Sequence, residues 1–200
     1  SSLYVGGTAI TATAAEINLL DGVTGILSSV TENSNTGVRL STSNASNHGD
    51  IGSNAVDLSY SNSSSSTRGA TGNYSVASGW QTIASGNYSV ASGWQTIASG
   101  NYSTARGVST TASGTESTAT GWQTTASGIG STAMGEQTTA SGESSTAMGY
   151  QSTASGIGST AMGKSTASGT YSSAIGYDAV ASGNGSVSYT HLTLPTNQCV

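Results

Sequence analysis

This sequence of 200 residues lacks most of what an ordinary globular core needs. It contains no Phe, and only 6% of its residues are aromatic, so a core of large apolar side chains is excluded. Charged residues also make up only 6% of the chain and Pro occurs once, whereas disordered chains are usually rich in both. The class that remains is a repetitive fold whose backbone hydrogen bonds provide much of the stability.

The scarcity of Cys, of basic residues and of long apolar runs excludes further classes. A single Cys199 cannot form an internal disulfide. Four basic residues against nine acidic ones give a net charge of −5, which does not suit a nucleic-acid partner. No apolar run approaches the ~20 residues that span a bilayer, so we expect no membrane span in this fragment. The chain opens on Ser1 rather than Met, and we expect it to be an internal piece of a longer protein.

Four regions differ in their pattern: 1–35, 36–69, 70–187 and 188–200. In the first, Thr13 and Glu16 have the spacing of a capping box, which predicts one short helix. The second is rich in Ser, Asn and Gly and predicts short strands and turns. There His48 is expected in a solvated turn, since no second cluster of metal ligands is visible. The last region holds the only Pro and the only Cys, breaks the preceding pattern, and is expected to be a non-native tail.

What the chain has in abundance is Gly, which recurs at every seventh residue from Gly72 to Gly163 and resumes at Gly169 after the loss of one residue. Ala stands two positions before each of these glycines, and Ser or Thr nearly always four before. One Gly per heptad would cost a helix about 1 kcal/mol each time, so a helix is excluded. β-branched residues such as Val76 favour strands, and Gly at a corner can adopt positive φ. Each seven-residue unit is therefore predicted to form a strand and a turn.

The residue before Gly alternates between small and large along much of the array, which doubles the period to fourteen residues. Each coil then holds two short strands, and the array is a parallel β-solenoid. We expect the Ala side chains to point inwards, because the size of the residue at this position never varies. We expect the outer face of the strand with the larger residues to contact a partner chain. If the larger side chains point inward instead, the coil survives but this interface assignment fails. The predicted interface residues are Met134, Met148, Met162 and Ile175.

An interior of Ala buries little apolar area, at ~25 cal/mol per Å², against the entropy of ordering the backbone. A single two-stranded roll would be marginally stable. We therefore expect an oligomer, in which packing of the outer faces supplies the missing burial.

Several units carry a resemblance to a known family: "SVASG" at Ser75–Gly79, "STAMG" at Ser131–Gly135 and "SSAIG" at Ser172–Gly176. They resemble the head repeats of trimeric autotransporter adhesins, the YadA-like left-handed β-roll, over roughly residues 70–186. The resemblance implies an all-β, left-handed parallel β-roll, a homotrimer, and an adhesive head on the bacterial cell surface or outer membrane that attaches to host cells or matrix. Thr often replaces Val here, and neither stalk heptads nor a membrane anchor are present.

The front of the chain points to a different source. The segment "ITATAAEINLLDGVTG" is similar to segments of phage tail fibres. This similarity implies, as the alternative, a tail-fibre shaft or receptor-binding segment of a virion.

The corner after Gly carries aromatic residues, and the candidate binding stripe consists of Trp80, Trp94, Trp122, Tyr150 and Tyr177. Because coils stack ~4.8 Å apart, Trp80 and Trp94 are predicted to lie one above the other. Flanked by Gln, such a stripe is a candidate contact for a host surface glycan or protein receptor. The alternative interpretation is that the rings stabilise the corners without any ligand.

We expect no enzymatic activity, no cofactor and no metal site. A hydrolase dyad needs two carboxyls about 5–10 Å apart in a cleft, whereas the carboxylates of the repeats fall at changing corner positions. These carboxylates are Glu116, Glu136, Glu143 and Asp178. A third class, an ice-binding solenoid, is suggested by a column of Thr that Val, Ile, Met and Ser interrupt.

Overall fold

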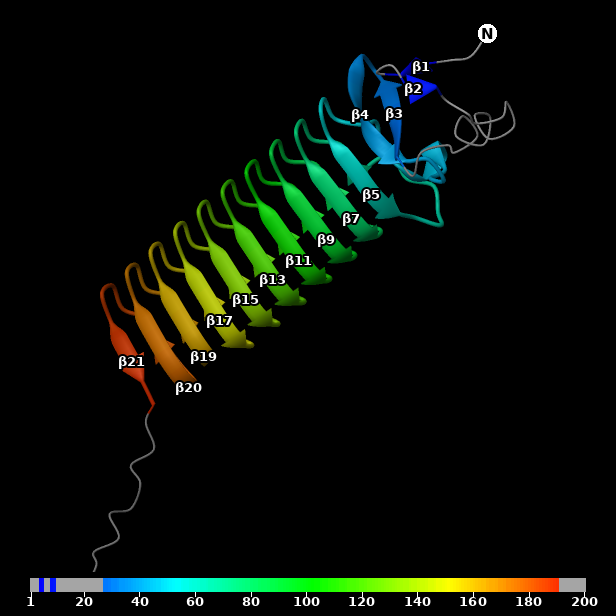
Figure 1. Ribbon diagram of the computed structural model, residues 1–200. Helices are drawn as coiled ribbons and strands as arrows, with labels where there is room; N and C mark the ends of the chain where they lie inside the picture. Colours follow the sequence, from blue (N-terminus) through cyan, green and yellow to red (C-terminus); the bar gives the residue numbers. More distant parts are fainter. Residues whose placement is uncertain (1–3, 6–7, 10–26, 191–200) are drawn as a thin grey trace, which may run out of the picture.

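A computed structural model of the chain describes residues 4–5, 8–9 and 27–190. Parallel strands stack along a rod from β5 at one end to β21 at the other, and a hairpin of β3 and β4 lies at the first end (Figure 1). The predicted all-β parallel β-solenoid is therefore confirmed.

Each regular coil consists of one strand of five residues and one of two residues. The long strands are β5 (Val56–Tyr60), β7 (Val76–Trp80), β9 (Val90–Trp94), β11 (Thr104–Val108), β13 (Thr118–Trp122), β15 (Thr132–Glu136) and β17 (Thr146–Tyr150). The short strands are β6 (Gly69–Ala70), β8 (Ile83–Ala84), β10 (Ile97–Ala98), β12 (Thr111–Ala112), β14 (Thr125–Ala126), β16 (Thr139–Ala140) and β18 (Thr153–Ala154).

The register repeats every fourteen residues, as predicted. Val76 pairs with Val90 on the long strands, and Ile83 pairs with Ile97 on the short ones. The Val76 amide donates to the carbonyl of Ser89 at 2.9 Å, and corresponding bonds connect one coil to the next along the rod. These bonds use the backbone itself to hold the coils together, so the fold does not depend on large side chains.

The interior of the rod is filled by small residues in columns. The Ala residues of both strands are fully buried, as Ala77 and Ala84 illustrate, and so are the Ser or Thr residues two positions before them, such as Ser75 and Thr82. The predicted inward orientation of the Ala face is confirmed. Because the interior of the regular coils holds only small side chains, the two strands of a coil can approach closely.

Two columns of Gly line the corners, and the close approach of the next coil requires Gly in both. At Gly121 the backbone has φ +130°, where a side chain is strained. At Gly100 no positive φ is present, but an added Cβ would lie within 3.0 Å of the carbonyl oxygen of Gly114 in the next coil. The prediction of positive φ is thus correct for one column only, whereas close stacking of backbones restricts both, since an added Cβ at Gly121 would also lie within 3.0 Å of the Gly135 carbonyl oxygen.

The first end of the rod departs from the repeat. β1 (Tyr4–Val5) pairs antiparallel with β2 (Thr8–Ala9), and β3 (Leu27–Glu32) pairs antiparallel with β4 (Asn35–Leu40). A 3-10 helix, η1 (Ala45–Asn47), follows. β4 then pairs in parallel with β5, so the stacking of coils extends further towards the N-terminus than the repeated units do. The helix predicted around Thr13 and Glu16 lies outside the described residues.

The second end contains a shortened coil. β19 (Thr160–Ala167) and β20 (Ser173–Ala181) each join a long and a short strand without a break, and their register shifts between Lys164 and Ser165. β21 (Val187–Tyr189) pairs in parallel with β20. The first residues of the segment set apart as a tail therefore continue the ladder, while 191–200 lie outside the described residues.

Candidate functional site

The outer face of the long strands carries the residues predicted to meet a partner. Met134 pairs with Met148, Met148 with Met162, and Met162 with Ile175. These four residues form one column, which we call the apolar ridge. Met134, Met162 and Ile175 are 39%, 37% and 46% exposed, and Met148 is half-buried. Large apolar side chains therefore lie in a continuous line on an open face of the single chain.

The five residues of the predicted stripe lie in one column at the corner that follows the long strand, which we call the aromatic corner. Trp80 and Trp94 stack with ring centroids 5.3 Å apart, which confirms the prediction that they lie one above the other. Tyr60 packs against Trp80 in a tilted arrangement, with ring centroids 5.1 Å apart and ring planes at 40°. Three other residues interrupt the column further along, namely Val108, Glu136 and Lys164. The stripe is thus one stack followed by separate rings.

Amide side chains run beside the aromatic corner. Gln95 donates to the side-chain oxygen of Gln81 at 3.2 Å, and Gln151 donates to that of Gln137 at 2.9 Å. These residues adopt φ near +51 to +55°, a conformation that costs most residues roughly 1–2 kcal/mol. The hydrogen bonds between neighbouring coils offset part of that cost, so the Gln column has a structural role of its own.

The opposite corner carries a second aromatic stack that the predicted site does not include. Tyr74, Tyr88 and Tyr102 stack with centroids 4.9 and 5.0 Å apart and rings within 2° of parallel. Beside them the Asn87 side chain accepts a hydrogen bond from the backbone amide of Asn73 at 3.0 Å. The Asn101 side chain likewise accepts one from the backbone amide of Asn87. The sequence signal for this stack was the repeated Asn-Tyr pair. Its regular hydrogen bonds support a structural role for the Asn residues.

Comparison with known families matches this geometry to a repeat family. The description "YadA head domain repeat (2 copies)" matches residues 70–96, 98–124, 126–152, 140–166 and 167–188, which is more than half of the chain. The chain belongs to the YadA head repeat family. No curated protein matches it.

The YadA head repeats begin at residue 70, and a cluster of charged side chains lies before them inside the first coils. Asp57 pairs with Ala77 and therefore stands in the interior Ala column. Arg39 donates from Nε to Asp57 Oδ2 at 3.2 Å and from Nη1 to Glu32 Oε1 at 2.9 Å. Arg39 and Asp57 are buried. We call this cluster the buried cap.

His48 belongs to the buried cap, so the expectation of a solvated turn is wrong. It is 6% exposed, and its Nδ1 lies 3.0 Å from Asp57 Oδ2. Burial opposes ionisation of Asp57 and is the largest single influence, but hydrogen bonds from His48 and Ser59 outweigh it and hold the pKa of Asp57 below its usual value of 3.8. The stability that this carboxylate contributes is therefore present above pH 3.8 and is lost as the pH falls through its lowered pKa.

The carboxylates of the YadA head repeats do not converge on a common site. Glu116, Glu136, Glu143 and Asp178 are exposed on corners. Within residues 4–5, 8–9 and 27–190, no group of three or more His, Cys, Asp or Glu side chains is placed to hold a metal ion. In the same described residues, no helix has the length and apolar character to cross a membrane.

Proposed function

We propose that this chain is a non-enzymatic adhesive head segment in which three copies associate side by side, each wound as a left-handed roll. The observation that carries the proposal is the apolar ridge, which lies on a chain of the YadA head repeat family. Exposed apolar surface in a continuous patch is typical of interaction sites. The interior of small residues supplies little apolar burial, so association through the ridge would add what a single chain lacks.

The ridge is suited to association with copies of itself. Its residues repeat at the spacing of the coils, so parallel chains present matching columns at the same height. The Thr residues beside the ridge, such as Thr146 and Thr160, are half-buried and add β-branched surface to the same face. A three-fold arrangement of parallel rods with the ridges facing the symmetry axis would bury each ridge against its two neighbours, and closed cyclic symmetry is common among homo-oligomers.

Replacing Met148 and Met162 by Glu should break the trimer. The substitutions place two like charges from each chain into the proposed interface, where unpaired charge is costly. We expect sedimentation equilibrium to give three times the 19.6 kDa chain mass for the wild type and a single chain mass for the variant. The matched control places Glu at Thr139 and Thr153, on the outer face of the short strands, and should remain trimeric. A wild type that sediments at 19.6 kDa contradicts the proposal.

We further propose that the trimer attaches to a host cell or matrix surface through its aromatic corner. Trp94, Trp122 and Tyr150 are 48%, 41% and 46% exposed, and aromatic side chains commonly contribute most to binding at protein surfaces. In this interpretation the segment is displayed outside the bacterial cell, at the outer membrane.

Replacing Trp94, Trp122 and Tyr150 together by Ser should weaken attachment of the purified protein to host cells at least about tenfold, as the loss of several aromatic contacts implies. Attachment is measured by titrating labelled trimer onto cells. The control replaces Tyr74, Tyr88 and Tyr102 on the opposite corner by Ser. Undiminished attachment by a folded, trimeric triple variant would exclude the aromatic corner as the contact surface.

A second candidate context is a phage tail fibre, which the segment at residues 10–25 favours by its similarity to tail-fibre segments. The physical function is the same in both cases, because a fibre is also an extended trimer that contacts a host surface. The two contexts differ in where the protein is found. Antibodies against the repeats should label bacterial cells in the first case and virions in the second.

A further inference from the structure

Several rings of the aromatic corner are covered in part by a neighbouring ring. Trp80 lies between Tyr60 and Trp94, with ring centroids 5.1 and 5.3 Å away. Trp122 stands between Val108 and Glu136 in the column. The rings nearest the second end of the rod, Tyr150 and Tyr177, are arranged differently.

Tyr150 has an open side because its neighbour turns away from it. The next residue in the column is Lys164, since Gly149 pairs with Gly163. Lys164 Nζ lies 4.6 Å from the ring centroid of Tyr177 and donates to its hydroxyl at 3.3 Å. Lys164 therefore covers Tyr177 rather than Tyr150. Tyr150 is 46% exposed and has no ring partner among the described residues.

The shortened coil leaves a gap beside these rings. In regular coils three residues separate the corner Gly from the β-branched residue of the short strand, as between Gly149 and Thr153, whereas only Lys164 and Ser165 separate Gly163 from Thr166. The missing residue is the one that belongs to the Gln column. Its neighbours on either side are Gln151 and Asp178, whose φ values of +51° and +56° place them in that column.

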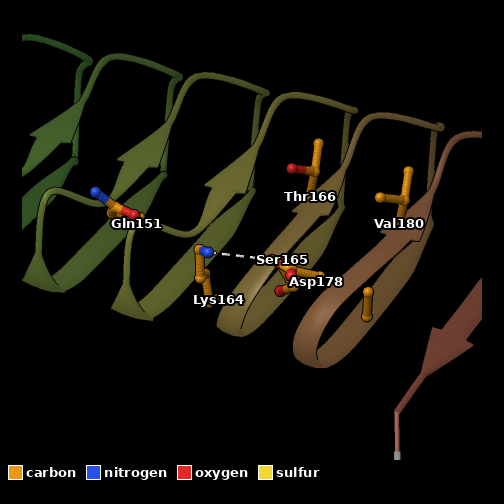
Figure 2. A pocket seen from close by; sticks show the side chains of 7 residues that line it. Gln151, Lys164, Ser165, Thr166, Asp178 and Val180 are labelled. Carbon is orange, nitrogen blue, oxygen red and sulfur yellow. Dashed lines mark ion pairs between the residues drawn. The ribbon is translucent and has the colours of Figure 1, made fainter.

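The gap is a depression of about 200 Å³ with polar groups around it. Figure 2 shows Gln151 on one side and Asp178 on the other, with Lys164 between them and the amide oxygen of Gln151 turned towards the side of Lys164. Lys164 Nζ and Asp178 Oδ1 are 3.3 Å apart, and their side chains are 33% and 63% exposed. Hydrogen bonds with Tyr177 and then Asp178 raise the pKa of Lys164, so it is charged at neutral pH.

An apolar groove of about 340 Å³ adjoins the gap and shares Lys164 with it. Its walls are Tyr150 and Tyr177, and its floor is the backbone of three stacked glycines, which are Gly149, Gly163 and Gly176. An added Cβ at each of them would lie within 3.0 Å of an atom of the next coil. No side chain can therefore narrow the floor.

The two depressions together match the chemistry of a sugar ring. A pyranose has an apolar face of C–H groups, which suits the side of an aromatic ring, and a rim of hydroxyls, which suits a carboxylate, an ammonium and an amide at close quarters. An anionic sugar is disfavoured, because Asp178 neutralises Lys164 and the chain carries a net charge of −5.

We propose that the corner at the shortened coil binds one neutral hexopyranose unit of a surface glycan. Its C–H face lies against Tyr150 over the glycine floor, and its hydroxyls bond to Asp178, Lys164 and Gln151. Asp178 accepts hydrogen bonds, and Lys164 donates them. The inference rests on the proposed function, because it specifies the ligand class for one part of the aromatic corner.

The test uses saturation-transfer NMR on the whole chain with three probes, which are methyl α-D-glucopyranoside, methyl α-D-mannopyranoside and methyl β-D-galactopyranoside. We expect saturable binding of at least one hexoside, with a Kd on the order of 1 mM. Tyr150→Ala should weaken it about tenfold through loss of the aromatic contact. Insertion of one Gln between Lys164 and Ser165 restores the regular coil, fills the gap and should abolish binding. Tyr102→Ala, the matched change on the opposite corner, should leave it unaltered.

The outcomes separate this inference from the proposed function. Absence of binding of all three hexosides by the wild type overturns the inference, and so does unchanged binding by both Tyr150→Ala and the insertion variant. Trimer mass and attachment to cells are measured on the same preparations. If the wild type is a trimer that attaches to cells yet binds no hexoside, the proposed function stands and the hexose site fails. If it binds a hexoside through Tyr150 without attaching to cells, the hexose site stands and the proposed function fails.

Discussion

Replacing Gly100 by Ala should lower the free energy of unfolding by about 3 kcal/mol or more, a large effect for the addition of one methyl group. The added Cβ would lie within 3.0 Å of the Gly114 carbonyl oxygen, which is backbone and cannot rotate away. The coils would have to separate, and the bond from the Ser99 amide to the Ala112 carbonyl, now 2.9 Å, would lengthen. Urea unfolding followed by circular dichroism measures the loss.

Gly130→Ala is the matched control for this prediction. Gly130 lies in another corner column, has φ +63°, and has only Ser144 Oγ near the position of an added Cβ, at 3.7 Å. The expected loss is about 1 kcal/mol, which is the cost of a left-handed conformation for Ala. Equal losses for the two variants would show that the approach of stacked coils is not what requires Gly at position 100.

The regular part of the fold could be predicted because the same local requirement returns in every coil. A constant Ala indicates an interior of fixed width, and Ala77 and Ala84 are indeed fully buried. The stacking of Trp80 on Trp94 followed from the fourteen-residue spacing alone. The reason for each Gly column could not be predicted, because a close approach between coils and a positive φ both require Gly.

The existence of the shortened coil could be predicted from the sequence, but the position of the missing residue could not. The sequence shows that one residue is lost before Gly169. It does not show from which column the residue is missing, since either corner or either strand could absorb the change. The register between β19 and β20 places the irregularity at Lys164 and Ser165, and this position brings Gln151 and Asp178 to the two sides of one gap.

The buried cap could not be predicted, because its members lie far apart in a segment without repeats. Glu32, Arg39, His48 and Asp57 come from a hairpin, a loop and the first long strand, and only the folded chain brings them together. A lone His in a segment rich in Ser, Asn and Gly gives no sign of burial, because His is intermediate in its preference for the interior. Here its ring is buried against the Asp57 carboxylate, which local sequence does not report.

Replacing Arg39 by Met should destabilise the first end of the rod by about 3–5 kcal/mol, which is the usual consequence of removing one partner from a buried ion pair. The guanidinium now contacts Asp57, Glu32 and the carbonyl oxygen of Gly49. Without it, the Asp57 carboxylate stays buried in the column that Ala occupies elsewhere and keeps only His48 and Ser59 as partners. Hydrogen exchange of the amides in β4 and β5, followed by mass spectrometry, should show faster opening of this end than in the wild type.

Lys164→Met removes a cation from an exposed ion pair and provides the contrast, since the side chains of Lys164 and Asp178 are 33% and 63% exposed. Exposed ion pairs contribute roughly 0–1 kcal/mol to stability, so the amides of the Lys164→Met variant should exchange nearly as in the wild type. The repeats carry their own hydrogen bonds from coil to coil, and faster exchange in Arg39→Met should therefore fade along the rod from β5 towards β17. Exchange that is unchanged in β4 and β5, or equally faster at both ends, would mean that the buried cap does not stabilise the end of the solenoid.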